Sequence, residues 1–215
     1  MWREISRAFG ESAEEYDAWY QENPLFEAEL AALKELGSPP QPALEIGVGT
    51  GVFAKALGFT YGLDPSFPML KRARSKGLWV VCGRGESLPF KEESFAACGL
   101  FFTLCFVEDP LQVLREARRI LKPQGKLWLG FIPADSSWAR YYEAKKRAGH
   151  KLYRFARFYP HDEVLKLVQE LGFSLEKEVS SLYQSPDESP RYEDPREGYQ
   201  KGAGFVALSL KKAPR

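Results

Sequence analysis

Residues 43–51 read ALEIGVGTG, an apolar run that passes into three glycines at alternate positions. The apolar residues 43–46 predict a buried strand, and the residues from Val52 onward predict a helix. Glycines at such a junction let the backbone turn sharply and approach a ligand closely, while the N-terminus of the helix presents free amide groups. The stretch therefore predicts a ligand-binding turn between a strand and a helix.

Short apolar runs continue to alternate with helical segments along the chain after this turn. Strands are expected at 43–46, 60–63, 78–82, 95–101 and 126–131, and helices at 52–57, 68–76 and 110–121. Runs that are apolar on both faces and are followed by helices are typical of a parallel sheet covered on both sides. The sequence therefore predicts an α/β fold with a doubly wound, Rossmann-like, mostly parallel sheet.

Length, charge and cysteine content narrow the class of protein. The chain has 215 residues, 44% hydrophobic and 27% charged, which suits one folded domain. Thirty Lys and Arg against 29 Asp and Glu give a net charge of +1, whereas general nucleic-acid binders carry a basic excess. The three cysteines lack the spacing of a disulfide framework or a metal site, and no apolar run reaches the roughly 20 residues of a membrane helix. We expect a cytoplasmic protein with no bound metal and no membrane segment.

A second motif, YGLDPS at 61–66, places an acid at the end of the second strand. In a doubly wound sheet Asp64 would lie beside the glycine turn, where it suits ribose hydroxyls. It could instead cap the following helix, a role that Ser66 also fits.

Two classes of cofactor use this geometry. The run GTGVFA at 49–54 matches the dinucleotide pattern, but Asp64 follows Gly51 by only 13 residues, where that fingerprint places its acid about 20 residues on. A carboxylate at Glu45 also suits a cationic amino-acid head better than a pyrophosphate. S-adenosylmethionine has such a head, and an NAD-dependent oxidoreductase is the alternative.

Four blocks in this order resemble the motifs of the class I S-adenosylmethionine-dependent methyltransferases, particularly the small type 11 group. The blocks lie at 45–51, 64–69, 85–95 and 121–127, within a match over roughly residues 16–131. The resemblance implies an enzyme with a seven-stranded sheet whose last strand, 204–211, runs antiparallel beside the fifth. It also implies an N-terminal helical cap over the cofactor.

The resemblance assigns residues to each part of the cofactor. The methionine part would contact Glu45, Gly47, Gly49 and Gly51. The ribose and adenine would contact Asp64, Pro65, Ser66, Met69, Gly85, Glu86 and Leu88. Leu100 and Phe101 would line the methyl region, and Tyr16 and Tyr20 would belong to the cap.

The sequence departs from the family pattern at three positions. Arg84 stands where relatives often carry an acid for the adenine amino group, and Ala96 stands where an acid usually follows Phe95. Cys105 with Phe106 replaces a histidine that many relatives carry after the fourth strand. No residue is therefore an evident catalytic base.

Two side chains are candidates for catalysis, and each has a simpler reading. His150 lies in a segment that could overhang the cofactor as a base or substrate contact. Cys105 could project near the methyl group, although a buried cysteine is usually inert. His161, directly before an expected helix, is interpreted as a capping or exposed residue.

Residues 140–159 carry seven basic side chains against one acid, so this segment has a charge of +6 and the rest of the chain −5. Aromatic residues are interleaved with the bases. The segment is interpreted as a substrate lid, with a solvated helix or a nucleic-acid surface as alternatives. If this segment lies beside the substrate entrance, the positive charges of Arg147, Lys151 and Arg154 would favour an acceptor with an anionic group.

We expect one domain over residues 1–215. It would comprise a helical cap at 1–40, a cofactor-binding core at 41–132, a helical lid or insertion at 133–173 and C-terminal strands at 174–215, as a monomer or homodimer. The predicted function is methyl transfer from S-adenosylmethionine to a small molecule, at nitrogen rather than oxygen, because a neutral amine needs no base in the displacement itself. Besides the oxidoreductase, the alternatives are a non-catalytic S-adenosylmethionine-binding module and an RNA or DNA methyltransferase.

Overall fold

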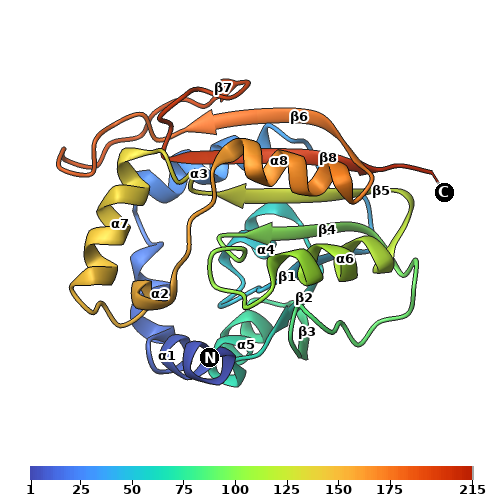
Figure 1. The fold of residues 1–215 in the computed structure, drawn as a ribbon. Coiled ribbons are helices and arrows are strands. Elements are labelled where there is room, and N and C mark those ends of the chain that lie inside the picture. The colour runs from blue at the N-terminus through green and yellow to red at the C-terminus, as the bar shows by residue number, and fades with distance from the viewer. Residues whose placement is uncertain (215) are drawn as a thin grey trace.

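An eight-stranded sheet runs through the centre of the molecule in the computed structural model, which describes residues 1–214 (Figure 1). Its strand order is β3-β2-β1-β4-β5-β8-β6-β7. The strands are β1 Ala43–Ile46, β2 Tyr61–Asp64, β3 Trp79–Cys82, β4 Phe95–Phe101, β5 Leu121–Phe131, β6 Phe173–Ser181, β7 Arg196–Glu197 and β8 Phe205–Lys212. The pairs among β1 to β5 are parallel, and β8 is antiparallel between β5 and β6. The predicted α/β fold and the antiparallel last strand beside β5 are confirmed.

The sheet has one strand more than the seven predicted. The additional strand, β7, is only two residues long and pairs with Val179 and Ser180 of β6. It belongs to the charged segment after β6, which turns back along the sheet edge. β5 also begins at Leu121, earlier than predicted, because Leu121 pairs with Phe95 ahead of a register shift.

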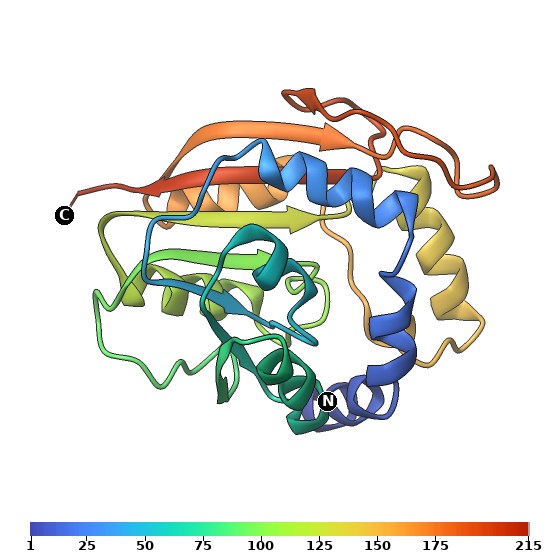
Figure 2. The same cartoon turned by 180° about the vertical axis from the view of Figure 1, so that it is seen from behind.

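Helices cover both faces of the sheet. They are α1 Trp2–Glu11, α2 Ala13–Trp19, α3 Pro24–Lys34, α4 Val52–Leu57, α5 Phe67–Ser75, α6 Pro110–Ile120, α7 Ser137–Arg147 and α8 His161–Glu170, with a 3-10 turn at Tyr153–Phe155. α6 and α8 cover the face seen in Figure 1, and α3 and α4 cover the face seen in Figure 2. Side chains alternate along each strand, so Leu44 and Ile46 join the core under α6 and α8, while Ala43 joins the core under α3 and α4.

The helix starts agree only partly with the sequence signals. Asn23 and Asp109 accept hydrogen bonds from the backbone at the starts of α3 and α6, as predicted. Ser12 and Ser66 precede α2 and α5, and both are residue types that commonly cap helices, but neither makes a side-chain cap bond. Before α5, the carboxylate of Asp64 accepts the amide of Ser66 at 2.8 Å.

Three helices stand beyond the carboxyl ends of the parallel strands. Figures 1 and 2 show α1, α2 and α7 grouped at that edge of the sheet, to which β4 and β5 point. Within the basic segment 140–159, the helical parts are α7, which begins at Ser137, and the 3-10 turn. This arrangement encloses the carboxyl edge, where doubly wound sheets bind ligands.

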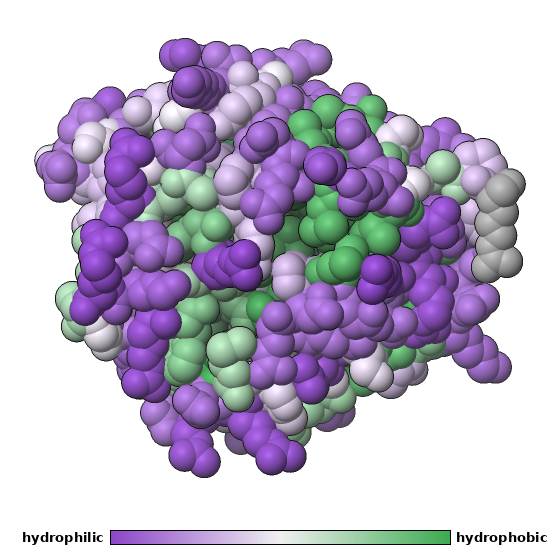
Figure 3. Space-filling model, in the orientation of Figure 1, coloured by the Kyte–Doolittle hydropathy of each residue, from purple (hydrophilic) through white to green (hydrophobic). Residues whose placement is uncertain are grey.

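The surface is mostly polar. Figure 3 shows hydrophilic side chains over most of the face that carries α6 and α8, with apolar side chains visible in its hollows. Among residues 1–214, no helix is both long and apolar enough to cross a membrane.

Candidate functional site

The three glycines of the first turn all have left-handed backbones, with φ of 76°, 52° and 81° at Gly47, Gly49 and Gly51. A Cβ at Gly47 would lie 2.5 Å from the Thr103 hydroxyl, and a Cβ at Gly51 would lie 2.6 Å from a leucine behind the turn. A Cβ at Gly49 would meet only Tyr16, at 3.8 Å. A side chain at Gly47 or Gly51 would therefore clash with packed neighbours, whereas the space beside Gly49 is largely open.

Asp64 lies directly beside this turn, as predicted. One carboxylate oxygen accepts the amide of Gly49 at 3.0 Å, and the other accepts the amide of Ser66. Burial nevertheless raises the pKa of Asp64 to about 6, because the two amide bonds offset only part of the desolvation cost. This carboxyl thus joins the first and second motifs and is poised to change charge near neutral pH.

Glu45 lies beneath the turn and is 2% exposed. Its Oε2 has no hydrogen-bond partner among the described residues. Burial first, and the nearby charge of Asp64 to a lesser degree, raise its pKa well above the usual range. The Ala54 backbone bonds to this carboxyl, but the unpartnered oxygen suits a ligand that brings a positive charge, such as the ammonium group of a methionine moiety.

Two neighbouring hollows follow the carboxyl edge from the glycine turn. The first, about 110 Å³, includes Tyr16, Gly47, Gly49, Asp64, Pro65, Met69 and Phe101 in its wall. The second, about 60 Å³, includes Gly47, Pro65, Arg84, Gly85 and Glu86. The fold thus brings together most of the residues that the resemblance assigned to the cofactor.

Some assigned residues lie elsewhere. Leu88 and Leu100 are buried in the core under α6 and α8. Successive side chains of a strand point to opposite faces, so Leu100 points away from the site while Phe101 points towards it. Gly51 and the buried Ser66 support the turn from outside the two hollows. Tyr20 lines the larger cavity described below rather than these hollows.

The sequence predicted a helical cap at 1–40 but indicated only Tyr16 and Tyr20 in it, so several residues that line the site were missed. Ile5 and Phe9 of α1 line the first hollow, together with Thr103, Phe106 and Val107 from the loop after β4. The amphipathic pattern of the first residues was the available signal for α1. The loop residues carry no motif, and only the position after a parallel strand points to them.

Arg84, the first departure from the family pattern, ties α1 over the second hollow. Its guanidinium bonds to Glu108 at 2.9 Å, approaches Glu86 at 3.4 Å and lies 5.1 Å from the centre of the Trp2 ring. Glu108 also accepts the Trp2 amide at 2.7 Å. A basic residue at this position therefore closes the hollow through a network of opposite charges.

A larger cavity of about 560 Å³ adjoins the first hollow, and the two share Phe9, Tyr16, Phe102 and Phe106. Its aromatic wall comprises Phe9, Tyr16, Trp19, Tyr20, Phe102, Phe106, Trp138, Tyr141, Tyr142, Tyr153 and Phe158. Its charged or titratable side chains are Glu15, Glu29, Lys145, His150 and Lys151. The Tyr20 hydroxyl donates to that of Tyr16 at 2.7 Å, which links the two spaces.

The basic segment contributes to this cavity unevenly. Lys145 and Lys151 belong to the wall, and the Lys145 ammonium lies 4.6 Å from the Tyr141 ring centre. Arg147 and Arg154 are exposed and do not line the cavity. Part of the basic character predicted for the entrance therefore faces the solvent.

Neither candidate base is well suited to take up a proton. His150 Nδ1 accepts the amides of Leu152 and Tyr153 at 3.2 and 3.3 Å, which assigns the ring proton to Nε2. Burial and the Lys145 charge lower its pKa. The Cys105 thiol donates to the Phe102 carbonyl, and burial raises its pKa to about 12. Both residues reach the cavity, but their bonding favours positioning over proton transfer.

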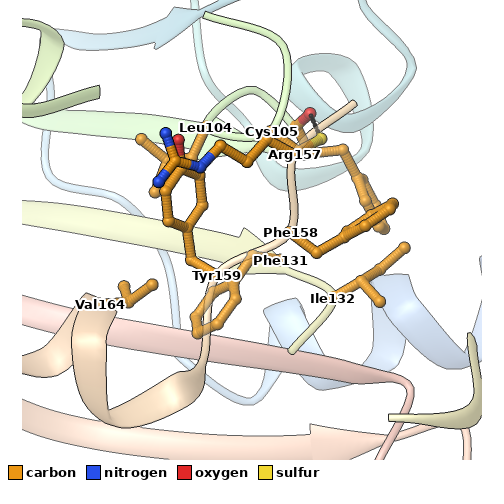
Figure 4. Close-up of a pocket in the computed structure, with 9 residues that line it drawn as sticks. Leu104, Cys105, Phe131, Ile132, Arg157, Phe158, Tyr159 and Val164 are labelled. Carbon is orange, nitrogen blue, oxygen red and sulfur yellow. Dashed lines mark hydrogen bonds between the residues drawn. The ribbon is translucent and has the colours of Figure 1, made fainter. Parts of the chain in front are cut away.

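A smaller hollow behind Cys105 is closed by the segment that follows the 3-10 turn. Figure 4 shows Arg157, Phe158 and Tyr159 across from Cys105, with the Arg157 guanidinium 5.1 Å from the Tyr159 ring centre. The Arg157 amide donates to the Cys105 carbonyl at 2.8 Å. The space is only about 10 Å³, which is room for about one water molecule. Residues 157–159 therefore pack closely against Cys105 and support the cavity wall.

His161 serves neither of its predicted roles. It is the first residue of α8 rather than its cap, it bonds to Glu178, and its ring stacks on Tyr199 at 3.7 Å. It joins α8 to the edge of the sheet and lies outside the site.

The mostly parallel sheet with its antiparallel β8 beside β5, the glycine turn after β1 and the acid after β2 fit the class I S-adenosylmethionine-dependent methyltransferases. Comparison with known proteins agrees. A family model described as a methyltransferase domain matches residues 44–129. A solved S-adenosylmethionine-dependent methyltransferase of Thermotoga maritima, described as a possible histamine N-methyltransferase, is 36% identical. Its TM-score is 0.88, over 97% of this chain and 99% of its own.

Two uncharacterized proteins are also similar. One from Mycobacterium tuberculosis is 44% identical over 210 residues, covering 95% of this chain and 73% of its own length. One from Methanocaldococcus jannaschii is 40% identical over 205 residues, covering 95% and 98%. The chain belongs to the class I, type 11 S-adenosylmethionine-dependent methyltransferases. It is an enzyme whose cofactor is S-adenosylmethionine.

Proposed function

We propose that this enzyme transfers a methyl group to a nitrogen atom of a small molecule bound in the larger cavity. The observation that carries the proposal is the shared wall at Tyr16 and Phe102, which places the larger cavity directly beside the hollow at the glycine turn. Acceptor and cofactor can therefore meet without leaving the protein. The aromatic wall excludes water from their meeting point.

The residues of this chain act by binding and alignment. S-adenosylmethionine supplies, when bound, a methyl group on a positively charged sulfur. Glu45 and the turn at Gly47 and Gly49 hold the methionine end, Asp64 holds the ribose, and Met69 with the wall around Gly85 and Glu86 holds the adenine. Phe101 and Tyr16 flank the reacting region, which keeps the acceptor in line with the sulfur.

Nitrogen is favoured over oxygen because neither His150 nor Cys105, the two side chains considered as bases, is free to take up a proton. The His150 proton lies on Nε2, and the Cys105 thiol is held against a carbonyl. A neutral amine needs no base in the displacement, whereas a hydroxyl does. The similarity to the Thermotoga maritima protein supports an amine acceptor as well.

Lys145 and Lys151 support an acceptor that also carries an anionic group, since both belong to the cavity wall. The enclosed, aromatic shape of the cavity favours a small molecule over a nucleic acid, which binds along open basic surfaces. A nucleic-acid substrate would have to insert a single base there.

The test is a screen for S-adenosylhomocysteine formation with paired amines and alcohols, beginning with histamine, and identification of the methylated atom by mass spectrometry. We expect transfer to amines, and loss of transfer in Asp64→Ala because the cofactor affinity falls. Methylation of the alcohols alone, or of added RNA alone, would replace this proposal.

A further inference from the structure

One carboxyl in the larger cavity has no role in cofactor binding. Glu29 lies on α3, whose buried residues Leu25, Ala28, Ala32 and Leu33 form an apolar face at helical spacing. Glu29 occupies a position on that same face and is 6% exposed. A glutamate on the buried face of a helix costs free energy unless something compensates its charge or polarity.

Nothing described in the structure provides that compensation. Glu29 Oε2 is buried and has no hydrogen-bond partner among residues 1–214. Burial is the cause that raises its pKa far above the usual range, with no basic group acting against it. Lys145, a cation of the same cavity wall, forms no ion pair with Glu29 among the described residues and lies over Tyr141 instead.

The surroundings of Glu29 resemble a cage for a cation. Tyr20, Tyr142 and Tyr153 line the same cavity as Glu29. Tyr142 and Tyr153 stack with ring centres 4.2 Å apart. Aromatic faces and a carboxylate both attract an ammonium or another cationic nitrogen, and desolvation strengthens the attraction.

We propose that Glu29 and its tyrosines form a recognition site for a cationic nitrogen of the acceptor. The Tyr20 hydroxyl donates to the hydroxyl of Tyr16, and Tyr16 also lines the hollow beside the glycine turn, so this pair connects the site to that hollow. Glu29 is therefore a positioning residue that selects the acceptor at a distance from the methyl group. With Lys145 and Lys151 in the same wall, the cavity suits an acceptor with a positive and a negative end. The inference rests on the proposed function only in taking this cavity as the acceptor site.

The experiment compares amines with alcohols of the same shape. Calorimetry with S-adenosylhomocysteine-saturated protein would use tyramine against tyrosol and benzylamine against benzyl alcohol. We expect each amine to bind at least tenfold more tightly than its alcohol in the wild type. Glu29→Gln should remove this difference without changing S-adenosylhomocysteine affinity, and Glu27→Gln, an exposed change on the same helix, should preserve it.

A second measurement separates recognition from a structural role. If Glu29 serves a ligand, its burial costs the free protein stability, so Glu29→Leu should raise Tm by a few degrees. A lower Tm, or stability coupling between Glu29→Leu and Lys145→Met, would assign Glu29 to the fold and overturn the proposal. Equal affinities for amines and alcohols in the wild type, or an unchanged difference in Glu29→Gln, would overturn it too.

The two proposals fail in different ways. The binding assay needs no methyl transfer, so amine selection by Glu29 together with methylation at oxygen would refute only the proposed nitrogen chemistry. Nitrogen methylation without any amine preference in binding would refute only the role of Glu29.

Discussion

Asp64 has a part-buried carboxyl for which we propose a role in holding the cofactor ribose. Ribose hydroxyls donate best to the ionised form, and this group has a pKa of about 6 in the ligand-free protein. The raised pKa also means that the folded state takes up this proton more readily than the unfolded state does. The carboxyl therefore lowers stability progressively as pH rises from about 4 to 6.

We predict that affinity for S-adenosylhomocysteine falls by about tenfold between pH 7 and pH 5, because protonation of Asp64 removes its charge. Calorimetric titration across this range measures the effect. Asp64→Asn should bind more weakly at pH 7 and lose most of the dependence, while Glu14→Gln, an exposed change in α2, should keep it. An affinity in the wild type that is flat down to pH 5 would contradict the role of Asp64.

At the scale of elements, α1 determines how tightly the cofactor hollows are closed. A Cβ at Gly10 would lie 2.9 Å from the Ser66 hydroxyl and 3.2 Å from Pro68, so α1 rests directly on the start of α5. The same helix supplies Trp2, Ile5 and Phe9 to the walls of the hollows.

Gly10→Leu should therefore lift α1 from α5 and weaken S-adenosylhomocysteine binding at least threefold, with faster hydrogen exchange in α1. Glu4→Leu, an exposed change on the same helix, is the matched control and should bind normally. If Gly10→Leu binds as tightly as the wild type, α1 is not a required wall of the cofactor site.

Sequence reasoning recovered elements better than their ends. The regular strands around β1 and β4 are apolar throughout, so their positions followed from local pattern alone. Ser12 and Ser66 have the right residue type for caps, but tertiary neighbours decide whether the hydroxyl reaches an amide. The helical cap predicted at 1–40 includes α1, but its lining residues were not named, because they follow from its contact with the start of α5, which no local pattern records.

At the scale of the whole molecule, the two hollows are lined by segments that are far apart in the sequence. α1, the glycine turn, the end of β2 and the loop after β4 all line the two hollows. A ligand that binds these segments together in the folded state stabilises the entire fold by mass action.

S-adenosylhomocysteine at about 100 times its Kd should therefore stabilise the protein by about 2.7 kcal/mol, which raises Tm by roughly 5–10 °C. Thermal unfolding followed by circular dichroism measures this shift. NAD at the same concentration should produce none, since the site carries a carboxyl where a pyrophosphate would lie. A larger shift with NAD would contradict the assignment of the hollows.

The sequence by itself determined the alternation of strands and helices, the glycine turn and the acid beside it, because these depend on neighbours within a few residues. That was enough for the fold class and for the glycine turn and the acid that line the first hollow. It did not determine that Leu100 turns away while Phe101 faces the site, or that Glu29 points into an aromatic cavity. Those features depend on which residues from distant segments meet at the carboxyl edge, and only tertiary packing decides that. The larger cavity is lined by residues of α2, α3 and α7 and by residues 150–158 after α7. Its chemistry therefore became visible only in the folded molecule.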